Sequence, residues 1–239
     1  MTRIPSLRPP VGFAHRGARA RAAENTLEAF QLALRLGATG IESDVWLTAD
    51  GKAVLDHDGV VGGRFRRRPI ASLARRELPS HIPELADLYA TCGDNFELSL
   101  DIKDPSAIAE VIATARDQGR AAESRLWVCH HEWRLLATWR ELSDGVKFVH
   151  STRLAHMEGG PEQHAATLRR AGIDAVNLHH TDWNGGRTTL FHRFGLLALA
   201  WDAQVERVLD AMLNAGIDGV YSDHVDRMME AIDRRRAHP

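Results

Sequence analysis

The chain has 239 residues, of which 44% are hydrophobic and 26% are charged, and its formal net charge is −2. This composition argues against a disordered protein, and the absence of a basic surplus argues against a nucleic-acid partner. The length suits an α/β barrel of roughly 250 residues in one domain. We therefore expect residues 1–239 to form a single domain.

Targeting signals are not evident in the sequence. Residues 1–10 lack the apolar segment of a secretory signal, and no run of about 18 apolar residues is present. The two cysteines, Cys92 and Cys129, are too far apart for a metal motif and too few for a disulfide framework. We expect a cytoplasmic protein without stable membrane insertion, and the sequence indicates no oligomeric state.

Short apolar runs alternate with helical stretches along the chain. The apolar runs predict strands at 11–15, 40–45, 53–57, 96–102, 125–129, 147–150, 175–178, 196–200 and 219–221. Helical spacing predicts helices at 26–36, 82–91, 106–118, 131–142, 161–171, 187–194, 204–215 and 225–236. Strand followed by helix, repeated about eight times, predicts a parallel sheet, and at this length closure into a barrel is favoured over an open sheet.

Residues 58–80 form the one irregular stretch and are rich in Gly and Arg. We expect them to form a small inserted loop or cap at the mouth of the barrel. The run Arg64–Arg68 could attract an anionic headgroup or a membrane surface, although most such runs are only solvated loops.

Ionisable side chains gather where the expected strands end. Because successive side chains in a strand alternate faces, Glu42 and Asp44 lie on the same face of their strand, and Asp101 and Lys103 lie on the same face of theirs. Active sites of α/β barrels lie at the carboxyl ends of the strands, so these groups should meet there. Two carboxylates on one buried face repel each other, and a divalent cation is the usual remedy.

Two histidines stand at the same kind of boundary. His15 ends the first expected strand, and His57 ends a short extension of the sheet. A pair of imidazoles near a cation can serve as general acid and general base. Together with the carboxylates, they indicate a metal-dependent hydrolase.

The segment 14–59 contains six short motifs in a fixed order. They are His-Arg-Gly, Glu-Asn-Thr, an apolar helix ending in Gly-Ala, Ile-Glu-x-Asp-Val, Thr-x-Asp-Gly and His-Asp. This combination resembles the glycerophosphodiester phosphodiesterase family. Later fragments at 82–85, 101–103, 200–201 and 215–223 also fit, whereas residues from about 120 to 195 resemble the family only weakly.

The resemblance implies a TIM (β/α)8 barrel that hydrolyses a small-molecule phosphodiester substrate, a glycerophosphodiester, to an alcohol and glycerol 3-phosphate. It also implies one divalent cation, Mg²⁺ or Ca²⁺. The residues that match the family's site are Glu42, Asp44 and Asp101 as metal ligands, His15 and His57 as general acid and base, and Arg16, Lys103 and the neighbouring Asn25 at the phosphate.

Two further positions bear on the site. The family usually has Glu where this chain has Asp101, and the shorter side chain withdraws the carboxylate by about 1.5 Å. Direct coordination then needs a backbone adjustment or an intervening water. Trp201, at the end of its strand, is predicted to wall the substrate pocket, with plain core packing as the alternative.

Other functions remain open. A lysophospholipase-D-like phosphodiesterase and a catalytically silent binding barrel share the same fold. A metal-dependent amidohydrolase is less consistent, because Phe13-Ala14-His15 lacks the His-x-His of those barrels. The histidines at 130–131, 150 and 179–180 invite a second metal site, but a polar rim is favoured because no carboxylate is suitably spaced in the sequence.

Overall fold

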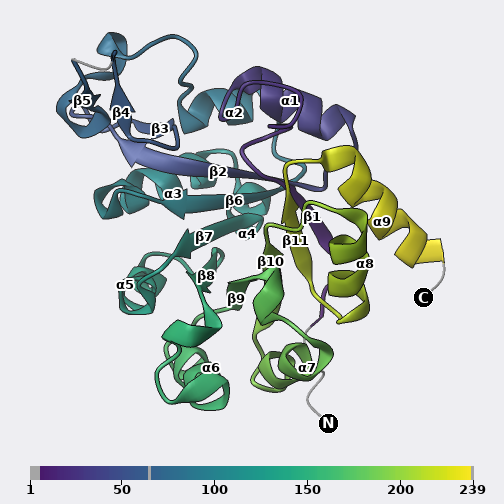
Figure 1. Ribbon diagram of the computed structural model, residues 1–239. Coiled ribbons are helices and arrows are strands. Elements are labelled where there is room, and N and C mark those ends of the chain that lie inside the picture. Colours follow the sequence, from purple (N-terminus) through teal and green to yellow (C-terminus); the bar gives the residue numbers. More distant parts are fainter. Residues whose placement is uncertain (1–5, 64–65, 238–239) are drawn as a thin grey trace.

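The computed structural model describes residues 6–63 and 66–237. Within these residues, eight parallel strands form a barrel that closes because β1 pairs with both β2 and β11 (Figure 1). The TIM-barrel prediction is confirmed. The eight strands are β1 (Val11–Ala14), β2 (Gly40–Leu47), β6 (Glu97–Ile102), β7 (Leu126–His130), β8 (Lys147–Thr152), β9 (Ala175–His179), β10 (Leu197–Trp201) and β11 (Gly219–Ser222).

Helices surround the barrel, as Figure 1 shows. Every predicted helix is present within a few residues of its expected bounds, and the short α4 is an addition. Among the described residues the helices are α1 (Leu27–Arg35), α2 (Leu85–Cys92), α3 (Ile108–Asp117), α4 (Arg120–Ser124), α5 (Trp133–Trp139), α6 (Gly160–Arg170), α7 (Gly185–Arg193), α8 (Glu206–Asn214) and α9 (Val225–Ala237).

The expected strand at 53–57 is not a barrel strand. It is the shorter β3 (Ala53–Leu55), which pairs antiparallel with the end of β2. Beyond it, the Asp56 amide donates to the Asp44 carbonyl at 3.1 Å. This hydrogen bond holds the chain around residue 57 at the carboxyl ends of the barrel strands.

The irregular stretch that follows has its own small apolar cluster. Its antiparallel strands are β4 (Val60–Val61) and β5 (Arg68–Pro69), followed by two short 3₁₀ turns. Ile70 and Leu73 are fully buried together with Val54 of β3. Arg64 of the arginine run lies outside the described residues, whereas the rest of the run, 66–68, is exposed.

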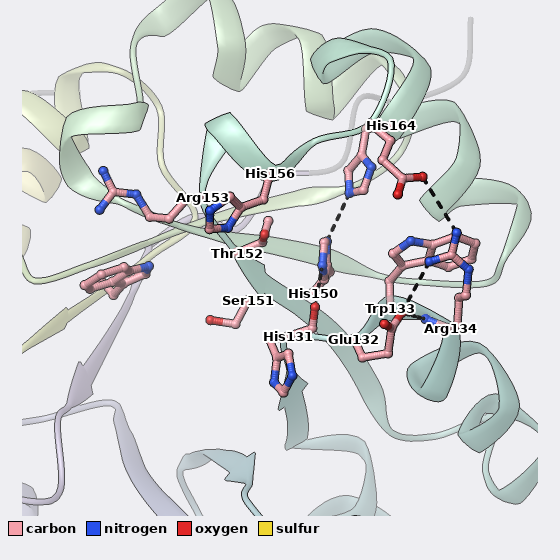
Figure 2. A pocket seen from close by; sticks show the side chains of 12 residues that line it. His131, Glu132, Trp133, Arg134, His150, Ser151, Thr152, Arg153, His156 and His164 are labelled. Atoms are coloured by element: carbon pink, nitrogen blue, oxygen red, sulfur yellow. Dashed lines mark hydrogen bonds and ion pairs between the residues drawn. The ribbon is translucent and has the colours of Figure 1, made fainter.

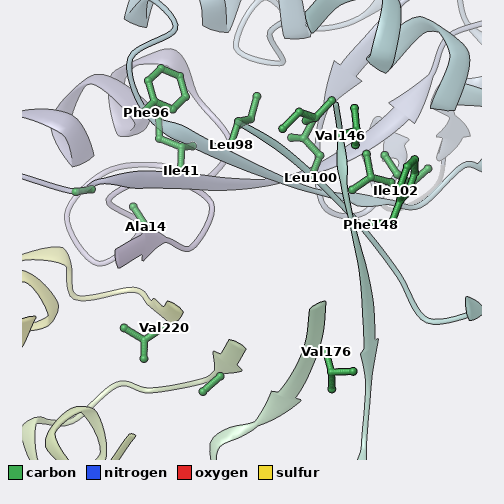
Figure 3. Packing of buried hydrophobic residues seen from close by; sticks show 14 of the residues in the cluster. Ala14, Ile41, Phe96, Leu98, Leu100, Ile102, Val146, Phe148, Val176 and Val220 are labelled. Atoms are coloured by element: carbon green, nitrogen blue, oxygen red, sulfur yellow. The ribbon is translucent and has the colours of Figure 1, made fainter. Parts of the chain in front are cut away.

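Side chains of the barrel strands alternate between two apolar layers. Leu98, Leu100 and Ile102 of β6 face outward and pack beneath the helices, as Figure 3 shows. Inside the barrel, Phe13 stacks on Tyr221 with ring centroids 4.7 Å apart. These inward side chains fill the amino-terminal part of the barrel, so polar side chains can gather only at the opposite end.

Among the described residues, no helix has the length and hydrophobicity needed to cross a membrane.

Candidate active site

A cavity of about 420 Å³ opens at the carboxyl ends of the barrel strands. All of the predicted site residues except His57 and Asn25 line it. Its floor is a polar layer in which the Ser99 hydroxyl lies 3.0 Å from the Tyr221 hydroxyl and 3.3 Å from the Cys129 sulfur. The floor separates the polar cavity from the apolar interior of the barrel. The predicted residues that line it are His15, Arg16, Glu42, Asp44, Asp101, Lys103 and Trp201.

His15 follows β1 and is held by a carboxylate from the opposite end of the chain. Its Nδ1 lies 2.6 Å from Asp223 Oδ1, and its Nε2 lies 3.9 Å from Glu42 Oε2. Burial lowers the pKa of His15, but Glu42 and the hydrogen bond to Asp223 outweigh burial, so that the pKa is raised. Asp223 therefore orients the imidazole and leaves Nε2 facing the cavity.

Asp223 has no role in the sequence-based prediction. The only signals for it are its position just after the last predicted strand, 219–221, and the match of Ser222-Asp223 to a later fragment of the family. Its contact with His15 spans 208 positions of the chain. The closure of the barrel between β1 and β11 brings the two residues together.

A tight turn after β1 directs Arg16 toward the carboxylates. Arg16 and Gly17 both have positive φ, and a Cβ at Gly17 would lie 2.8 Å from Ala29. Only glycine fits this close approach to α1. The turn places the Arg16 amide 3.0 Å from Glu42 Oε2 and the Arg16 Nε 3.3 Å from Asp44 Oδ2.

The three predicted metal ligands come from two adjacent strands. The register of β2 against β6 puts Asp44 opposite Asp101. The ammonium of Lys103 lies between them, 3.2 Å from Asp44 Oδ1 and 2.6 Å from Asp101 Oδ2. Burial raises the pKa of Glu42 to about 7, with Asp44 and Asp101 adding to the rise and His15 opposing it.

Asn25 lies behind the cavity wall and does not line it. Its Nδ2 donates to Asp44 Oδ2 at 3.2 Å, and its Oδ1 accepts from the Ser43 hydroxyl at 2.7 Å. Both ends of this buried amide are thus used by β2. In this arrangement Asn25 positions Asp44.

His57 lies at the rim. Its side chain is 39% exposed, its Nδ1 lies 2.8 Å from Asp58 Oδ1, and it does not line the cavity. The hydrogen bond between the neighbouring Asp56 and Asp44 keeps it beside the carboxylate strand. It is therefore the one predicted proton carrier that the structure leaves outside the cavity wall.

Trp201 ends β10 and lines the cavity on the side away from β2. The His179 ring packs against its indole edge to face, with ring centroids 4.5 Å apart. Trp201 also lines a second cavity beside the first. Trp201 thus lines the cavity, and its contact with a substrate stays a prediction.

A group of possible metal ligands lies next to Trp201. His179, His180 and Asp202 place ligand atoms within 4.8 Å of one another, and they are the one such group among the residues that the structure describes. The sequence suggested no carboxylate for these histidines. Asp202 supplies one because β9 and β10 are neighbours, with Trp201 opposite His179 in their register.

Comparison with known proteins agrees with the fold and the motifs. The sequence model of the glycerophosphoryl diester phosphodiesterase family matches residues 15–227. The chain is 25% identical over 243 residues to the glycerophosphodiester phosphodiesterase of Caldanaerobacter subterraneus subsp. tengcongensis, covering 92% of this chain and 96% of that protein.

Solved structures show the same barrel. The glycerophosphodiester phosphodiesterase of Thermotoga maritima superimposes with a TM-score of 0.79 at 22% identity, covering 92% of this chain and 97% of that one. A phosphodiesterase of Oleispira antarctica, solved with the product sn-glycerol-3-phosphate, gives a TM-score of 0.78 at 21% identity, covering 94% and 97%. The family match spans most of the chain, which therefore belongs to the glycerophosphoryl diester phosphodiesterase family.

Proposed function

We propose that this protein hydrolyses glycerophosphodiesters to an alcohol and glycerol 3-phosphate, using a divalent cation, Mg²⁺ or Ca²⁺. The main support is one cavity in which Glu42, Asp44 and Asp101, two cationic side chains and a carboxylate-held histidine face the same space. The names of the full-length relatives support the reaction, and the glycerol 3-phosphate complex of the Oleispira antarctica phosphodiesterase supports the product.

Glu42, Asp44 and Asp101 are the proposed ligands of the cation. Their oxygen atoms suit Mg²⁺ or Ca²⁺, and the proposal is supported by the raised pKa of Glu42, to which burial contributes most and the neighbouring Asp44 and Asp101 contribute further. When bound, such an ion supplies Lewis-acid stabilisation of phosphoryl oxygens. We prefer this cluster to the group around His179 because Arg16 and Lys103, the two candidate phosphate ligands, contact its carboxylates.

Arg16 and Lys103 are the proposed phosphate ligands. Both line the cavity, and both now contact Asp44. Each can exchange a carboxylate contact for a phosphoryl oxygen without leaving the cavity. Their fixed positive charge then stabilises the charge that develops on the oxygens during the displacement. The structure supports Asn25 in this scheme as a positioning residue for Asp44 rather than as a substrate contact.

His15 and His57 are the proposed proton carriers. One removes a proton from the nucleophile, which is water or a neighbouring substrate hydroxyl, and the other protonates the departing alkoxide. Asp223 stabilises the His15 imidazolium while it carries the proton. His57, at the rim, is placed to serve the part of the substrate nearest to solvent.

The remaining predictions concern the whole molecule. We propose that residues 1–239 act as one barrel domain and that residues 58–80 form a small cap at its mouth. The absence of a nucleic-acid partner and the cytoplasmic location stay predictions. A lysophospholipase-D-like activity is the alternative that the first experiment separates.

That experiment measures the release of glycerol 3-phosphate from a panel of glycerophosphodiesters and the release of the headgroup alcohol from a lysophospholipid, in chelated buffer and with added Mg²⁺ or Ca²⁺. We expect turnover of the diesters that EDTA abolishes and the cations restore. Glu42→Gln should raise the cation concentration for half-maximal rate, because it removes a charged ligand. The matched control is His180→Ala, which alters the other candidate metal group and should leave that concentration unchanged.

Three results would overturn the proposal. Full activity in chelated buffer would exclude a metal-dependent reaction. A shift in the cation requirement with His180→Ala but not with Glu42→Gln would move the ion to the group around His179. Binding of diesters without any turnover would indicate the silent binding barrel.

A further inference from the structure

A second cavity of about 340 Å³ lies beside the candidate active site, over the ends of β7 and β8 (Figure 2). Ser151 and Trp201 line both cavities. The two cavities therefore adjoin at Ser151 and Trp201. A substrate held at the carboxylates of the first cavity can extend past these two residues into the second. None of the nine predicted site residues other than Trp201 lines this second cavity.

We propose that this second cavity binds the alcohol half of the diester and selects an uncharged polyhydroxy alcohol, such as a glycerol or inositol headgroup, over a choline or ethanolamine headgroup. The inference rests on the proposed hydrolysis of glycerophosphodiesters. It adds the substrate class, which the family's sequence motifs do not reveal.

The arginines of the cavity are the first support. Arg153 Nε lies 2.7 Å from Asp182 Oδ2, and its guanidinium stands 5.8 Å from the centre of the Trp201 ring. Arg134 stands 4.7 Å from the centre of the Trp133 ring. A quaternary ammonium binds well over an open aromatic face. Here each of the two indoles already has a guanidinium over it.

The carboxylates of the cavity are likewise engaged. Glu132 and Glu158 both face Arg134, at 3.6 Å and 3.7 Å. Two glutamates and two arginines are among the described residues that line the cavity, so the lining has no excess of either charge to attract a cationic or an anionic headgroup.

A chain of hydrogen bonds through His150 is the second support, and Figure 2 draws its bond to His164. His150 Nε2 lies 3.0 Å from the His131 carbonyl, which only accepts, so this nitrogen carries the hydrogen. His150 Nδ1 then accepts from His164 Nε2 at 3.1 Å. The chain requires an unprotonated His150 Nδ1, and burial lowers the pKa of His150 to about 4.

His150 and His164 thus use these hydrogen bonds on each other and on the His131 carbonyl, and they leave the Ser151 and Thr152 hydroxyls to bond a ligand beside the rings of Trp133 and Trp201. Hydroxyl groups beside aromatic rings suit the alternating hydroxyl and C–H surface of a polyol. Hydroxyl groups can also be matched without displacing any of the ion pairs.

The test compares kcat/KM for glycerophosphoglycerol and glycerophosphoinositol with kcat/KM for glycerophosphocholine and glycerophosphoethanolamine. We expect the polyol diesters to be favoured by at least about tenfold, since a site built for hydroxyl hydrogen bonds discriminates against substrates that lack them. Equal values for all four diesters would overturn the inference.

Two variants sharpen the comparison. Thr152→Val keeps the shape but removes a hydroxyl, and it should lower kcat/KM for polyol diesters only, by about fivefold for one lost hydrogen bond. Arg134→Gln uncovers Trp133 and frees two carboxylates, so it should raise kcat/KM for the choline diester about two- to fivefold. The control, Arg193→Gln, removes the same charge from an exposed position on α7 and should change neither class.

A binding measurement separates this inference from the proposed reaction. Quenching of tryptophan fluorescence by free myo-inositol, but not by choline chloride, should be seen in the wild type and weakened by Thr152→Val. If that pattern appears without turnover of any diester, the proposed reaction fails and the pocket assignment holds. If diesters turn over but choline quenches as well as myo-inositol, the pocket assignment fails alone.

Discussion

The two sides of the barrel mouth place the same residue type in opposite surroundings. On the β1–β2 side, Glu42 and Asp223 raise the pKa of His15 against the effect of burial. On the β7–β8 side, burial and the neighbouring His164 lower the pKa of His150 to about 4. The balance of burial and neighbouring charge, more than the imidazole itself, decides which histidine can carry a proton.

We therefore propose different roles for the two sides of the barrel mouth. The first side concentrates unbalanced charge around Asp44, where a cation, a phosphate and a moving proton can be stabilised. The second side pairs its charges among themselves and presents neutral groups. A diester lying across the shared wall at Ser151 and Trp201 would put its phosphate on the first side and its alcohol on the second.

Removing a proton carrier should break the first side most severely. We expect His15→Ala to lower kcat by about 10²- to 10⁴-fold, the usual contribution of general acid–base catalysis. His57→Ala should act over the same range if the rim histidine reaches the substrate. Steady-state kinetics together with thermal melting checks both, because neither residue lies in the apolar core.

The two histidines differ in their surroundings. His15 lines the cavity and is held by Asp223, whereas His57 is exposed and lies outside the cavity wall. Turnover retained in His57→Ala, with a native melting curve, would leave His15 as the sole proton carrier of this pair. Turnover retained in His15→Ala would contradict the proposed mechanism as a whole.

The sequence predicted the first side well because its residues come from short local motifs. His15, Arg16 and Gly17 are consecutive, and Glu42 and Asp44 share a face by strand alternation alone. Backbone geometry within a few residues determines where such groups point. The barrel closure then needed only a count of strands and helices.

The second side could not be predicted in the same way. Its ion pair between Arg153 and Asp182 joins segments 29 positions apart. This contact depends on which loops follow neighbouring strands and how those loops turn. The same limit hid Asp223, whose partner His15 lies at the other end of the chain.

Acid should destabilise the second side before it affects most carboxylates. Because the pKa of His150 is lowered from 6.5 to about 4, the unfolded chain binds a proton at this residue that the folded protein refuses. The contribution to stability is intact above pH 6.5 and is lost as the pH falls toward 4. At 1.36 kcal/mol per pH unit, the loss approaches about 3 kcal/mol.

Denaturant unfolding between pH 7 and pH 4.5 measures this loss. His150→Gln keeps a donor for the His131 carbonyl but cannot be protonated, so its free energy of unfolding should fall less than that of the wild type. His81→Gln, at an exposed histidine, should follow the wild type throughout. Parallel curves for the wild type and His150→Gln would show that His150 is not held neutral by its surroundings.

Lengthening the third carboxylate should have the smallest effect and tests how the first side holds its cation. Asp101 now contacts the Lys103 ammonium at 2.6 Å, opposite Asp44 in the neighbouring strand. Asp101→Glu extends the carboxylate by about 1.5 Å, so it should be tolerated and lower the half-saturating concentration of Mg²⁺ or Ca²⁺. Asp101→Asn keeps the length but removes the charge, and it should raise that concentration.

Calorimetric titration of both variants with the cation alone separates ion binding from turnover. If Asp101→Glu abolishes ion binding while the protein stays folded, the site requires the shorter acid. The contact between Asp101 and Lys103 then belongs to the geometry of the site itself and does not take the place of the ion.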